Sequence, residues 1–391
     1  MIEGIDKISN KGRIAIVAVG YNRPKALSRL LDSVSNAQYE VPDVPLVISI
    51  DASGNQELYD FVNGYQWKHG QKFVNIQSER LGLKDHIFKC MSLSRYFKGV
   101  IILEDDIFVS PFFYHYAITS LDKYGNDNRV AGIALYTNEY DGGNGVPIQH
   151  LNNGYDVFAW QECCTWGELF NERMWNNFST WMKHFNDDFS DIDISETIKK
   201  WPRAWSKYMM AYMAENNRFF IFPHVSVTTN FNDAGGEHGG GDSSLVQVSL
   251  LQGEKKYQLG DFDELVHYDC YLGNLEIADW IGVNAIDLTV DFYGGRTMYK
   301  SRYILAPFDL PYKKIRGYRL CMRPWELNVK YGIEGSDLFL YDRETTKPEI
   351  APCRVYSFAH IIYFLGRYKQ NLKPHFLSKL YVTKLKRKLG L

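Results

Sequence analysis

The chain has 391 residues, of which 45% are hydrophobic and 23% charged, and its formal net charge is −2. This length predicts one large domain with an extension, or two domains. The balanced charge argues against nucleic-acid binding, and no run approaches the roughly 18 apolar residues of a membrane-spanning helix. The six cysteines form no CxxC pair, and the segment 1–12 lacks the apolar stretch of a secretion signal. We therefore expect a cytoplasmic protein with free thiols.

The first hundred residues alternate between strand and helix patterns. Apolar runs predict buried strands over 13–19, 45–51, 72–77 and 100–106. An amphipathic helix follows the first strand, with Asn22 as its cap and Pro24 in its first turn, and a second helix is predicted over 84–97. Short connections between alternating elements predict a mostly parallel sheet with helices on both faces. The GxGxxG motif is absent, which argues against a dinucleotide ligand.

Three acids, Glu104, Asp105 and Asp106, end the fourth predicted strand. Ligands of open α/β sheets gather outside the carboxyl ends of strands, which is where these acids fall. Adjacent carboxylates that are partly dry need a cation, or the pKa of at least one must rise. Carboxylates are hard ligands that suit Mn²⁺ or Mg²⁺, and such an ion would hold a diphosphate by its oxygens. A solvated loop after a strand is the simpler alternative.

Polar residues also follow the other predicted strands. Arg23 comes after the first strand, Asp51 ends the second, and His86 lies just beyond the third. Arg23 could meet a phosphate or a base, and Asp51 could hydrogen-bond a nucleobase or ribose. Because these strand ends meet at one edge of the sheet, the residues together predict a nucleotide-diphosphate site.

From about residue 150 the pattern becomes aromatic and irregular. The segment 158–181 contains aromatic residues that could stack on an acceptor sugar, although packing in the core explains most of them equally well. A stripe of large side chains on 205–213 predicts a buried helix face, and 218–227 predicts a strand. A glycine-rich loop follows over 232–244. Beyond residue 255 no architecture is predicted, except for a terminal helix over 376–389 with a basic face.

Several of these stretches resemble known glycosyltransferases. LEDDIFVSPFF (103–113) resembles the metal-binding motif of GT-A glycosyltransferases, in particular the animal N-acetylglucosaminyltransferase I group. IAIVAVGYNRP, SIDASG and KDHIFKCM resemble the nucleotide-sugar half of that group. TWGELFNERMW, AWSKYM and TTNFNDAGGEH are similar to bacterial glycosyltransferases of polysaccharide clusters. The resemblance covers roughly residues 13–245. It implies an α/β GT-A fold, Rossmann-like, with a C-terminal extension.

The resemblance implies roles for the acidic residues. Asp106 would be the direct ligand of a Mn²⁺ or Mg²⁺ ion. Glu104 and Asp105 would contact the ribose and the sugar, or order the water molecules of the metal. It also implies three parts of the chain: a nucleotide-sugar-binding half at 1–150, an acceptor-side half at 151–250, and a C-terminal extension at 251–391.

The resemblance further implies a nucleotide pocket. Asp51 would hold uracil, and Arg23 and His86 would line the pocket. His238, in the glycine-rich loop, would approach the diphosphate or the metal, unless it is simply an exposed loop residue. The donor is therefore expected to be a nucleotide-diphosphate sugar linked to UDP.

The resemblance fails at the catalytic base. The animal enzymes place a catalytic Asp in a WDDW helix start, where this sequence has WSKY at 205–208. An inverting transferase needs a carboxylate to take the proton of the acceptor hydroxyl. The candidates are Glu168 first, then Glu162, Asp233 and Glu237. A retaining front-face reaction, or donor binding without turnover, would need no such base.

These arguments predict a metal-dependent glycosyltransferase, hexosyl- or N-acetylhexosaminyl-specific, that extends a bacterial surface glycan such as O-antigen of lipopolysaccharide or capsule. The basic terminal helix would lie on an anionic leaflet at the inner face of the membrane, which suits a lipid-linked acceptor. The alternative for that helix is packing against its own domain or a partner. Two rival functions stay open: a nucleotidyltransferase, for which GYNRPK is a poor phosphate loop, and a carbohydrate-binding protein with a decayed active site.

Overall fold

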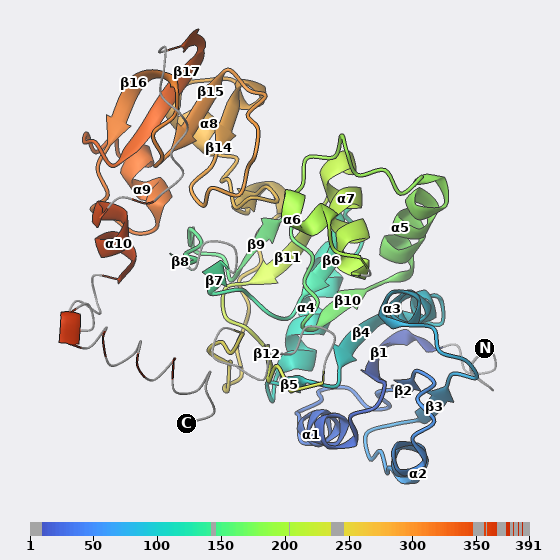
Figure 1. The fold of residues 1–391 in the computed structure, drawn as a ribbon. Coiled ribbons are helices and arrows are strands. Elements are labelled where there is room, and N and C mark those ends of the chain that lie inside the picture. Colours follow the sequence, from blue (N-terminus) through green and yellow to red (C-terminus); the bar gives the residue numbers. More distant parts are fainter. Residues whose placement is uncertain are drawn as a thin grey trace. The chain divides into compact units, whose positions relative to one another are not determined.

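The computed structural model describes residues 10–141, 146–202, 204–235, 246–346, 356 and 358–365, with further positions at 373–375, 378, 382 and 385. The chain forms two compact units (Figure 1). Unit 1 comprises Met1–Gly142 with His150–Leu275, and unit 2 comprises Gly143–Gln149 with Glu276–Leu391. The predicted division of roles at residues 150 and 250 stays a prediction.

Unit 1 is built around a nine-stranded sheet with the order β13-β9-β11-β6-β10-β4-β1-β2-β3 in the described part of the chain. Its strands are β1 (Asn10–Gly20), β2 (Leu46–Ile50), β3 (Lys72–Ile76), β4 (Phe97–Glu104), β6 (Val130–Ala134), β9 (Val157–Trp160), β10 (Glu168–Phe170), β11 (Phe219–Pro223) and β13 (His267–Tyr268). Most neighbouring pairs are parallel, whereas β10 runs antiparallel to both β4 and β6, and β9 to β11. The predicted α/β class with a mostly parallel sheet is confirmed.

The helices of unit 1 fall into two groups. They are α1 (Pro24–Ser35), α2 (Gln56–Gly64), α3 (Leu83–Ser92), α4 (Phe113–Tyr124), α5 (Glu172–His184), α6 (Glu196–Lys199) and α7 (Trp205–Asn216). Helix α1 packs on α2, and α3 packs on α5 and α7 (Figure 1). The chain moves outward from β1 through α1 and α2 and returns to β4 through α3. Right-handed crossovers therefore place α3 on the opposite face of the sheet from α1 and α2.

The central strands are apolar because both of their faces are covered. In β1, Ile14, Ile16 and Val17 are at most 1% exposed, and every residue of β2 is buried. The apolar side of α1 is equally buried, as its 3.6-residue period predicts. Pro24 opens that helix as expected, but the prediction that Asn22 caps it is wrong. Asn22 instead accepts a hydrogen bond from the Nδ2 of Asn55, which is itself the cap of α2.

Three predicted elements end earlier than the sequence patterns indicate. The helix predicted over 84–97 ends at Ser92 and is followed by a short 3₁₀ turn, after which β4 begins. Strand β4 ends at Glu104, so that Asp105 and Asp106 form a turn. The strand predicted over 218–227 ends at Pro223, where the chain leaves the sheet.

The acidic turn leads into a small ribbon. Strand β5 (Ile107–Val109) pairs antiparallel with β12 (Thr228–Asn230), and the register places Asn230 opposite Ile107. This pairing brings the chain that follows β12 back beside Asp105 and Asp106. A further short strand of unit 1 is β7 (Tyr140–Asp141).

Unit 2 contains a four-stranded sheet in the order β14-β15-β17-β16 within its described residues. Its elements are β8 (Val146–Pro147), α8 (Ile277–Ile281), β14 (Leu288–Val290), β15 (Tyr303–Ala306), β16 (Tyr312–Tyr318), α9 (Trp325–Lys330), β17 (Leu338–Thr346) and α10 (Phe358–Leu365). Its core includes Ile304, Phe308 and Tyr341, whose hydroxyl donates to the Phe308 carbonyl at 2.6 Å. No architecture was predicted for this region.

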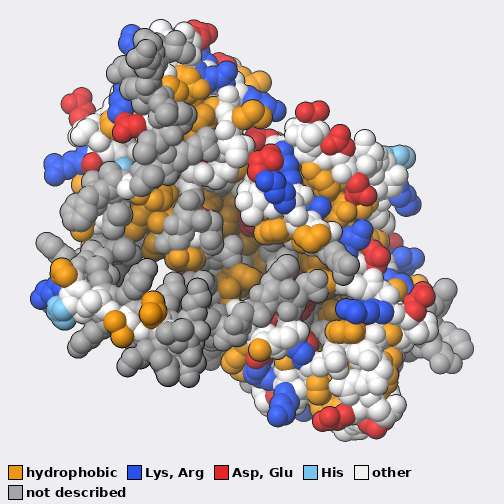
Figure 2. All heavy atoms as spheres, in the orientation of Figure 1, with side chains coloured by type: hydrophobic (Ala, Val, Ile, Leu, Met, Phe, Trp, Pro, Cys, Tyr) orange, Lys and Arg blue, Asp and Glu red, His pale blue; other side chains and the backbone are white. Residues whose placement is uncertain are grey.

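The terminal helix, the search for membrane-spanning helices and the distribution of surface charge relate to the predicted membrane contact. The basic helix predicted over 376–389 lies almost entirely outside the described residues. Among the helices that are described, none has both the length and the apolar character needed to cross a bilayer. On the face seen in Figure 2, Lys and Arg side chains are interspersed with Asp and Glu.

Candidate nucleotide-sugar site

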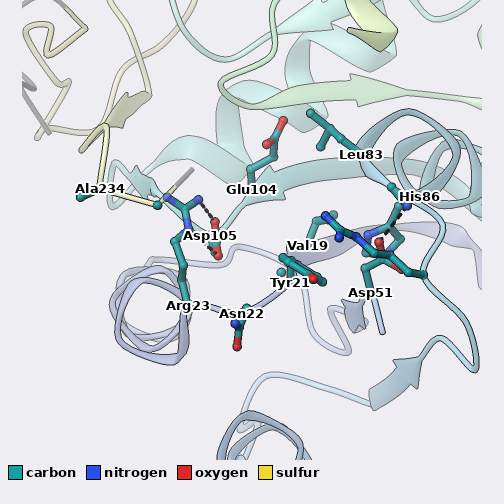
Figure 3. A pocket seen from close by; sticks show the side chains of 14 residues that line it. Val19, Tyr21, Asn22, Arg23, Asp51, Leu83, His86, Glu104, Asp105 and Ala234 are labelled. Atoms are coloured by element: carbon teal, nitrogen blue, oxygen red, sulfur yellow. Dashed lines mark hydrogen bonds and ion pairs between the residues drawn. The ribbon is translucent and has the colours of Figure 1, made fainter. Parts of the chain in front are cut away.

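A pocket of about 490 Å³ lies in unit 1 at the carboxyl ends of β1, β2 and β4 (Figure 3). Its lining residues are Val19, Gly20, Tyr21, Asn22, Arg23, Asp51, Arg80, Gly82, Leu83, His86, Glu104, Asp105, Ala234 and Gly235. Five residues predicted from the strand ends are among them. Asp106 does not line the pocket, although its neighbour Asp105 does.

Arg23 is the cation of the acidic cluster. Its Nε donates a hydrogen bond to Asp105 Oδ2 at 3.1 Å, and its Nη2 donates to the other carboxylate oxygen, which makes the pair bidentate (Figure 3). The same Nη2 lies 3.4 Å from Asp106 Oδ2. One guanidinium therefore serves two of the three neighbouring carboxylates.

The acidic cluster remains short of positive charge. Burial, together with Asp106 and Asp105, raises the pKa of Glu104 well above its ordinary value. Burial raises the pKa of Asp105 to about 6 even though Arg23 opposes the shift, and burial also raises the pKa of Asp106. These directions are those predicted for close carboxylates that are partly removed from water. An additional cation at this position would favour the ionised forms.

The side chain of Asp51 organises the backbone around the pocket. It is 4% exposed, and its oxygens accept hydrogen bonds from the amides of Ala52, Leu81 and Gly82, each at 2.9 Å. The last two amides lie immediately before α3. Asp51 thus ties the end of β2 to the start of α3, and any ligand contact would use its remaining lone pairs.

His86 is a neutral residue of the pocket wall. It is 3% exposed, and its Nε2 lies 2.7 Å from the hydroxyl of Ser49 in β2. Burial lowers the pKa of His86 to about 4. At neutral pH the ring therefore offers hydrogen bonds and an apolar surface to a ligand, and no charge.

The carboxylates fit a divalent ion under one condition. Among the described residues no group of three or more His, Cys, Asp or Glu side chains is arranged to hold a metal. Mg²⁺ and similar ions, however, often take one or two carboxylates and complete their shell with water and phosphate oxygens. Asp105 and Asp106 supply such oxygens, but both face the guanidinium of Arg23. A metal therefore fits here if Arg23 gives up at least one of them.

Arg29 of α1 and Arg23, the residue before this helix, hold the chain that follows β12. Arg29 donates to both carboxylate oxygens of Asp233 and stacks 3.9 Å from the ring centroid of Phe231. Arg23 Nη1 donates to the backbone carbonyl of Asp233 at 3.3 Å. Asp233, a candidate base, is thus engaged by Arg29. The other two candidates from this loop, Glu237 and His238, lie outside the described residues.

Glu168 lies near Glu104 on the sheet and does not line the pocket. It is the first residue of β10 and is 1% exposed, and the register places it opposite Ile102 of β4. Glu104 is two residues further along β4 and therefore on the same face. Glu168 Oε2 accepts from the amide of Gly167 at 3.2 Å, and its buried Oε1 has no partner among the described residues. Burial and the charge of Glu104 raise the pKa of Glu168 well above its usual range.

The other candidates of the aromatic segment are less suited to a ligand site. Burial raises the pKa of Glu162 to about 8, and its Oε1 accepts from the amide of Cys163 at 3.0 Å. Phe158 and Trp160 belong to β9 and are at most 2% exposed, so they pack in the core and are not available to stack on a sugar. Of the two explanations given for these two aromatics, core packing holds.

One cation of the pocket was not predicted from the sequence. Arg80 lies in the loop before α3, and its guanidinium stacks 4.7 Å from the ring centroid of Tyr21, which also lines the pocket. Gly82, two residues further along this loop, has a φ of 78°, a conformation that favours glycine. The available signal was the position of this loop after the third strand, because such loops carry ligand contacts in α/β sheets.

A known protein is similar in sequence to part of this chain. No family model matches the chain. Over 263 residues it is 26% identical to an alpha-1,3-mannosyl-glycoprotein 2-beta-N-acetylglucosaminyltransferase of Arabidopsis thaliana, covering 63% of this chain and 52% of that protein. The chain thus spans about half the length of the curated relative it matches. The resemblance to the N-acetylglucosaminyltransferase I group is confirmed.

Solved structures with partial likeness are glycosyltransferases. S. aureus TarS 1-349 in complex with UDP-GlcNAc has a TM-score of 0.36 and 14% identity, covering 55% of this chain and 57% of that chain. The mannosyltransferase PcManGT from Pyrobaculum calidifontis, in complex with GDP-Man and Mn²⁺, has a TM-score of 0.36 and 14% identity and covers 54% of each chain. GalNAc-T7 with UDP, GalNAc and Mn²⁺ has a TM-score of 0.39 and 12% identity, covering 54% of this chain and 42% of that chain.

Proposed function

We propose that this protein is a metal-dependent glycosyltransferase that moves a sugar from a nucleotide-diphosphate sugar to a growing glycan. The observation that carries the proposal is the pocket at the carboxyl ends of β1, β2 and β4, where Arg23 clamps one member of a three-carboxylate cluster. Its volume of about 490 Å³ suits a ligand of this size, since small-molecule sites span roughly 300–1,000 Å³. The similarity to an N-acetylglucosaminyltransferase supports a sugar donor.

The donor that we propose is linked to UDP. Asp51 is assigned to the nucleobase, and Arg23 and His86 to the nucleotide and its phosphates. The position of all three in one pocket supports this assignment. Because His86 is neutral at pH 7, its contact with the donor would be a hydrogen bond or packing and not an ion pair.

The acidic cluster is assigned to metal and sugar. Asp106 would hold Mn²⁺ or Mg²⁺, and Glu104 and Asp105 would contact the ribose and sugar or order the metal's waters. Such an ion supplies charge neutralisation for the diphosphate as it leaves. The raised pKa values of Glu104 and Asp106 support the need for another cation at this position.

The catalytic base that we propose is Glu168, with Asp233 and Glu237 as further candidates. A base must take the proton of the acceptor hydroxyl in an inverting reaction. Glu168 is favoured because its Oε1 is buried and has no partner among the described residues, and because it lies on the same face as Glu104. The raised pKa of Glu168 favours its protonated form, whereas a base has to be ionised. Further positive charge in the site would favour ionisation. Asp233 would first have to leave Arg29.

The proposed acceptor is a bacterial surface glycan, such as O-antigen or capsule, on a lipid carrier at the inner face of the membrane. The similarity of three segments to polysaccharide-cluster transferases supports it. The nine Lys and Arg residues after Glu349, with no acid among them, support contact with an anionic leaflet.

Calorimetry with nucleotides and nucleotide sugars, with and without Mn²⁺, tests the function. We expect one diphosphate family to bind only with metal, and Asp106→Asn to abolish both this binding and transfer. Asp122→Asn is the matched control, because that exposed carboxylate pairs with Lys98 away from the pocket. Metal-independent binding that survives Asp106→Asn would refute the metal assignment. Donor hydrolysis above background separates an enzyme from a non-catalytic binding protein.

A further inference from the structure

Two lysine side chains meet over one aromatic ring beside the candidate pocket. Lys84 is the second residue of α3 and Lys207 the third of α7. Their Nζ atoms lie 4.9 Å and 5.4 Å from the ring centroid of Tyr208. Lys207 Nζ also lies 4.4 Å from the ring centroid of Phe189. Both ammonium groups therefore contact the ring of Tyr208, and the charge of Lys84 acts on Lys207.

Lys207 has the environment of a binding residue. It is 8% exposed, yet its Nζ has no hydrogen bond and no carboxylate within ion-pair distance among the described residues. The Nζ of Lys207 is not among the fully buried side-chain nitrogens without a partner, so this ammonium is open to solvent and to a ligand. Burial lowers the pKa of Lys207, and the charge of Lys84 lowers it further. Bringing two like charges together costs free energy unless an anion neutralises them.

The nearby acids do not supply that anion. Lys84 lies 4.0 Å from the carboxylate of Asp85, whose side chain is 64% exposed. Asp187, which is exposed, faces Tyr208 and Lys207 and opposes the lowering of the Lys207 pKa, but forms no ion pair with it. Both acids are hydrated, and neither lies between the two ammonium groups at bonding distance.

The position of the lysines points to the acceptor. Lys84 directly follows Gly82 and Leu83, which line the pocket, and α3 packs on α7. Neither lysine lines the pocket, and we call their position next to its Gly82–Leu83 wall the rim of the proposed donor site. Inside that site, the diphosphate has cations of its own in Arg23 and Arg80. A second anionic group at the rim would then belong to the other substrate.

We propose that Lys84 and Lys207 bind an anionic group, a phosphate or a carboxylate, on the acceptor glycan. This inference rests on the proposed function, because the rim is an acceptor site only if the pocket binds a nucleotide sugar. The class of acceptor is therefore an acidic glycan, since a neutral one would leave Lys207 without an ionic partner and Lys84 with only the exposed Asp85. Each ammonium presents three donors to such a group.

Calorimetry on the full chain saturated with UDP and Mn²⁺ tests the proposal, with glucose 6-phosphate, glucuronic acid and glucose as probes. We expect the two anionic probes to bind at least tenfold more tightly than glucose. Lys84→Met and Lys207→Met each lower that affinity about tenfold. They leave UDP affinity and melting temperature unchanged, because Met keeps the packing of the side chain stem. Lys98→Met, a lysine paired with Asp122 elsewhere, is the matched control.

Asp187→Asn supplies a test in the opposite direction. Removing this negative charge beside Lys207 should tighten the binding of glucose 6-phosphate two- to fivefold, which a merely structural lysine would not produce. Equal binding of glucose and glucose 6-phosphate, or anion binding that survives both lysine substitutions, overturns the proposal. A loss of UDP affinity in Lys207→Met also overturns it, since the lysines then serve the donor.

The failure of the proposed function would look different. If the unmodified protein binds no nucleotide, the donor assignment falls. Lysine-dependent binding of glucose 6-phosphate measured without UDP would then show an anion site, and its assignment to an acceptor would be wrong.

Discussion

Arg23 and Asp105, 82 residues apart in the sequence, form a bidentate ion pair at the candidate site. The same guanidinium lies 3.4 Å from Asp106. Arg23 is thus the counter-ion of the acidic cluster in this structure. A divalent ion and this guanidinium cannot use the same carboxylate oxygens, so the binding of one weakens that of the other.

Replacing Arg23 should therefore strengthen the binding of a divalent ion. We expect Arg23→Gln to bind Mn²⁺ about tenfold more tightly in the absence of nucleotide, roughly 1.4 kcal/mol, because the metal no longer competes with the guanidinium. The affinity for a nucleoside diphosphate should fall in the same variant. Titration calorimetry with MnCl₂ alone, and then with UDP, measures both effects.

Arg29→Gln is the control for this experiment. Arg29 lies in α1 and, like Arg23, holds Asp233, but it has no hydrogen bond or ion pair with Asp105 or Asp106. Its replacement should leave the affinity for Mn²⁺ alone unchanged. Equal Mn²⁺ affinity in the Arg23 variant and the unmodified protein would contradict competition.

The buried ring of His86 predicts how stability depends on pH. Its pKa is about 4 in the folded protein and about 6.5 in the unfolded chain. Between pH 4 and pH 6.5 the unfolded state binds more protons than the folded state. The stabilisation associated with the neutral buried ring is therefore fully present above pH 6.5, and it is lost as the pH falls toward 4. The loss is on the order of 3 kcal/mol. Asp105, whose pKa is raised to about 6, acts in the opposite sense over part of the range.

A comparison with His86→Asn isolates the histidine. Denaturant unfolding at pH 7 and pH 4.5 gives the change in free energy for each protein. The unmodified protein should lose more stability than the variant between these two values, because Asn does not titrate. Equal losses would show that His86 stays neutral in both states or is protonated in both.

The central part of the fold could be predicted from the sequence for a clear physical reason. A strand covered on both faces needs a continuous apolar run, and β1 and β2 have one. Strand β10 could not be predicted in this way, because it is three residues long and lies in an irregular aromatic segment. Its place is decided by antiparallel pairing with β4 and β6, which are distant in sequence. Long-range pairing leaves no local pattern.

Part of the candidate site could also be predicted from the sequence. Residues at strand ends could be grouped because parallel strands end at one edge of the sheet, and Arg23, Asp51, His86, Glu104 and Asp105 line one pocket. The functional roles of these residues stay predictions. The sequence could not show that Arg23 binds Asp105, nor that the amides of Leu81 and Gly82 engage Asp51, since both facts depend on side-chain and loop geometry.

Glu168 allows a test of the proposed catalytic base that separates chemistry from folding. We expect Glu168→Gln to change the free energy of unfolding by less than about 1 kcal/mol at pH 7, because the amide has the shape of the neutral carboxyl. Transfer should fall by about a hundredfold or more if the residue is the base. A transfer assay beside denaturant unfolding measures both. Full activity in this variant would exclude Glu168 as the base.

Asp51 is expected to combine a structural role with the proposed contact to the nucleobase. Asp51→Ala leaves the amides of Ala52, Leu81 and Gly82 without their acceptor, which should cost about 2–3 kcal/mol of unfolding free energy. Asp51→Asn keeps one acceptor oxygen and should cost less, while changing what is offered to a base. Unfolding and the ratio of UDP to GDP affinity should be measured for both. If Asp51→Asn keeps its preference for UDP unchanged, Asp51 only holds the loop before α3 and another group reads the base.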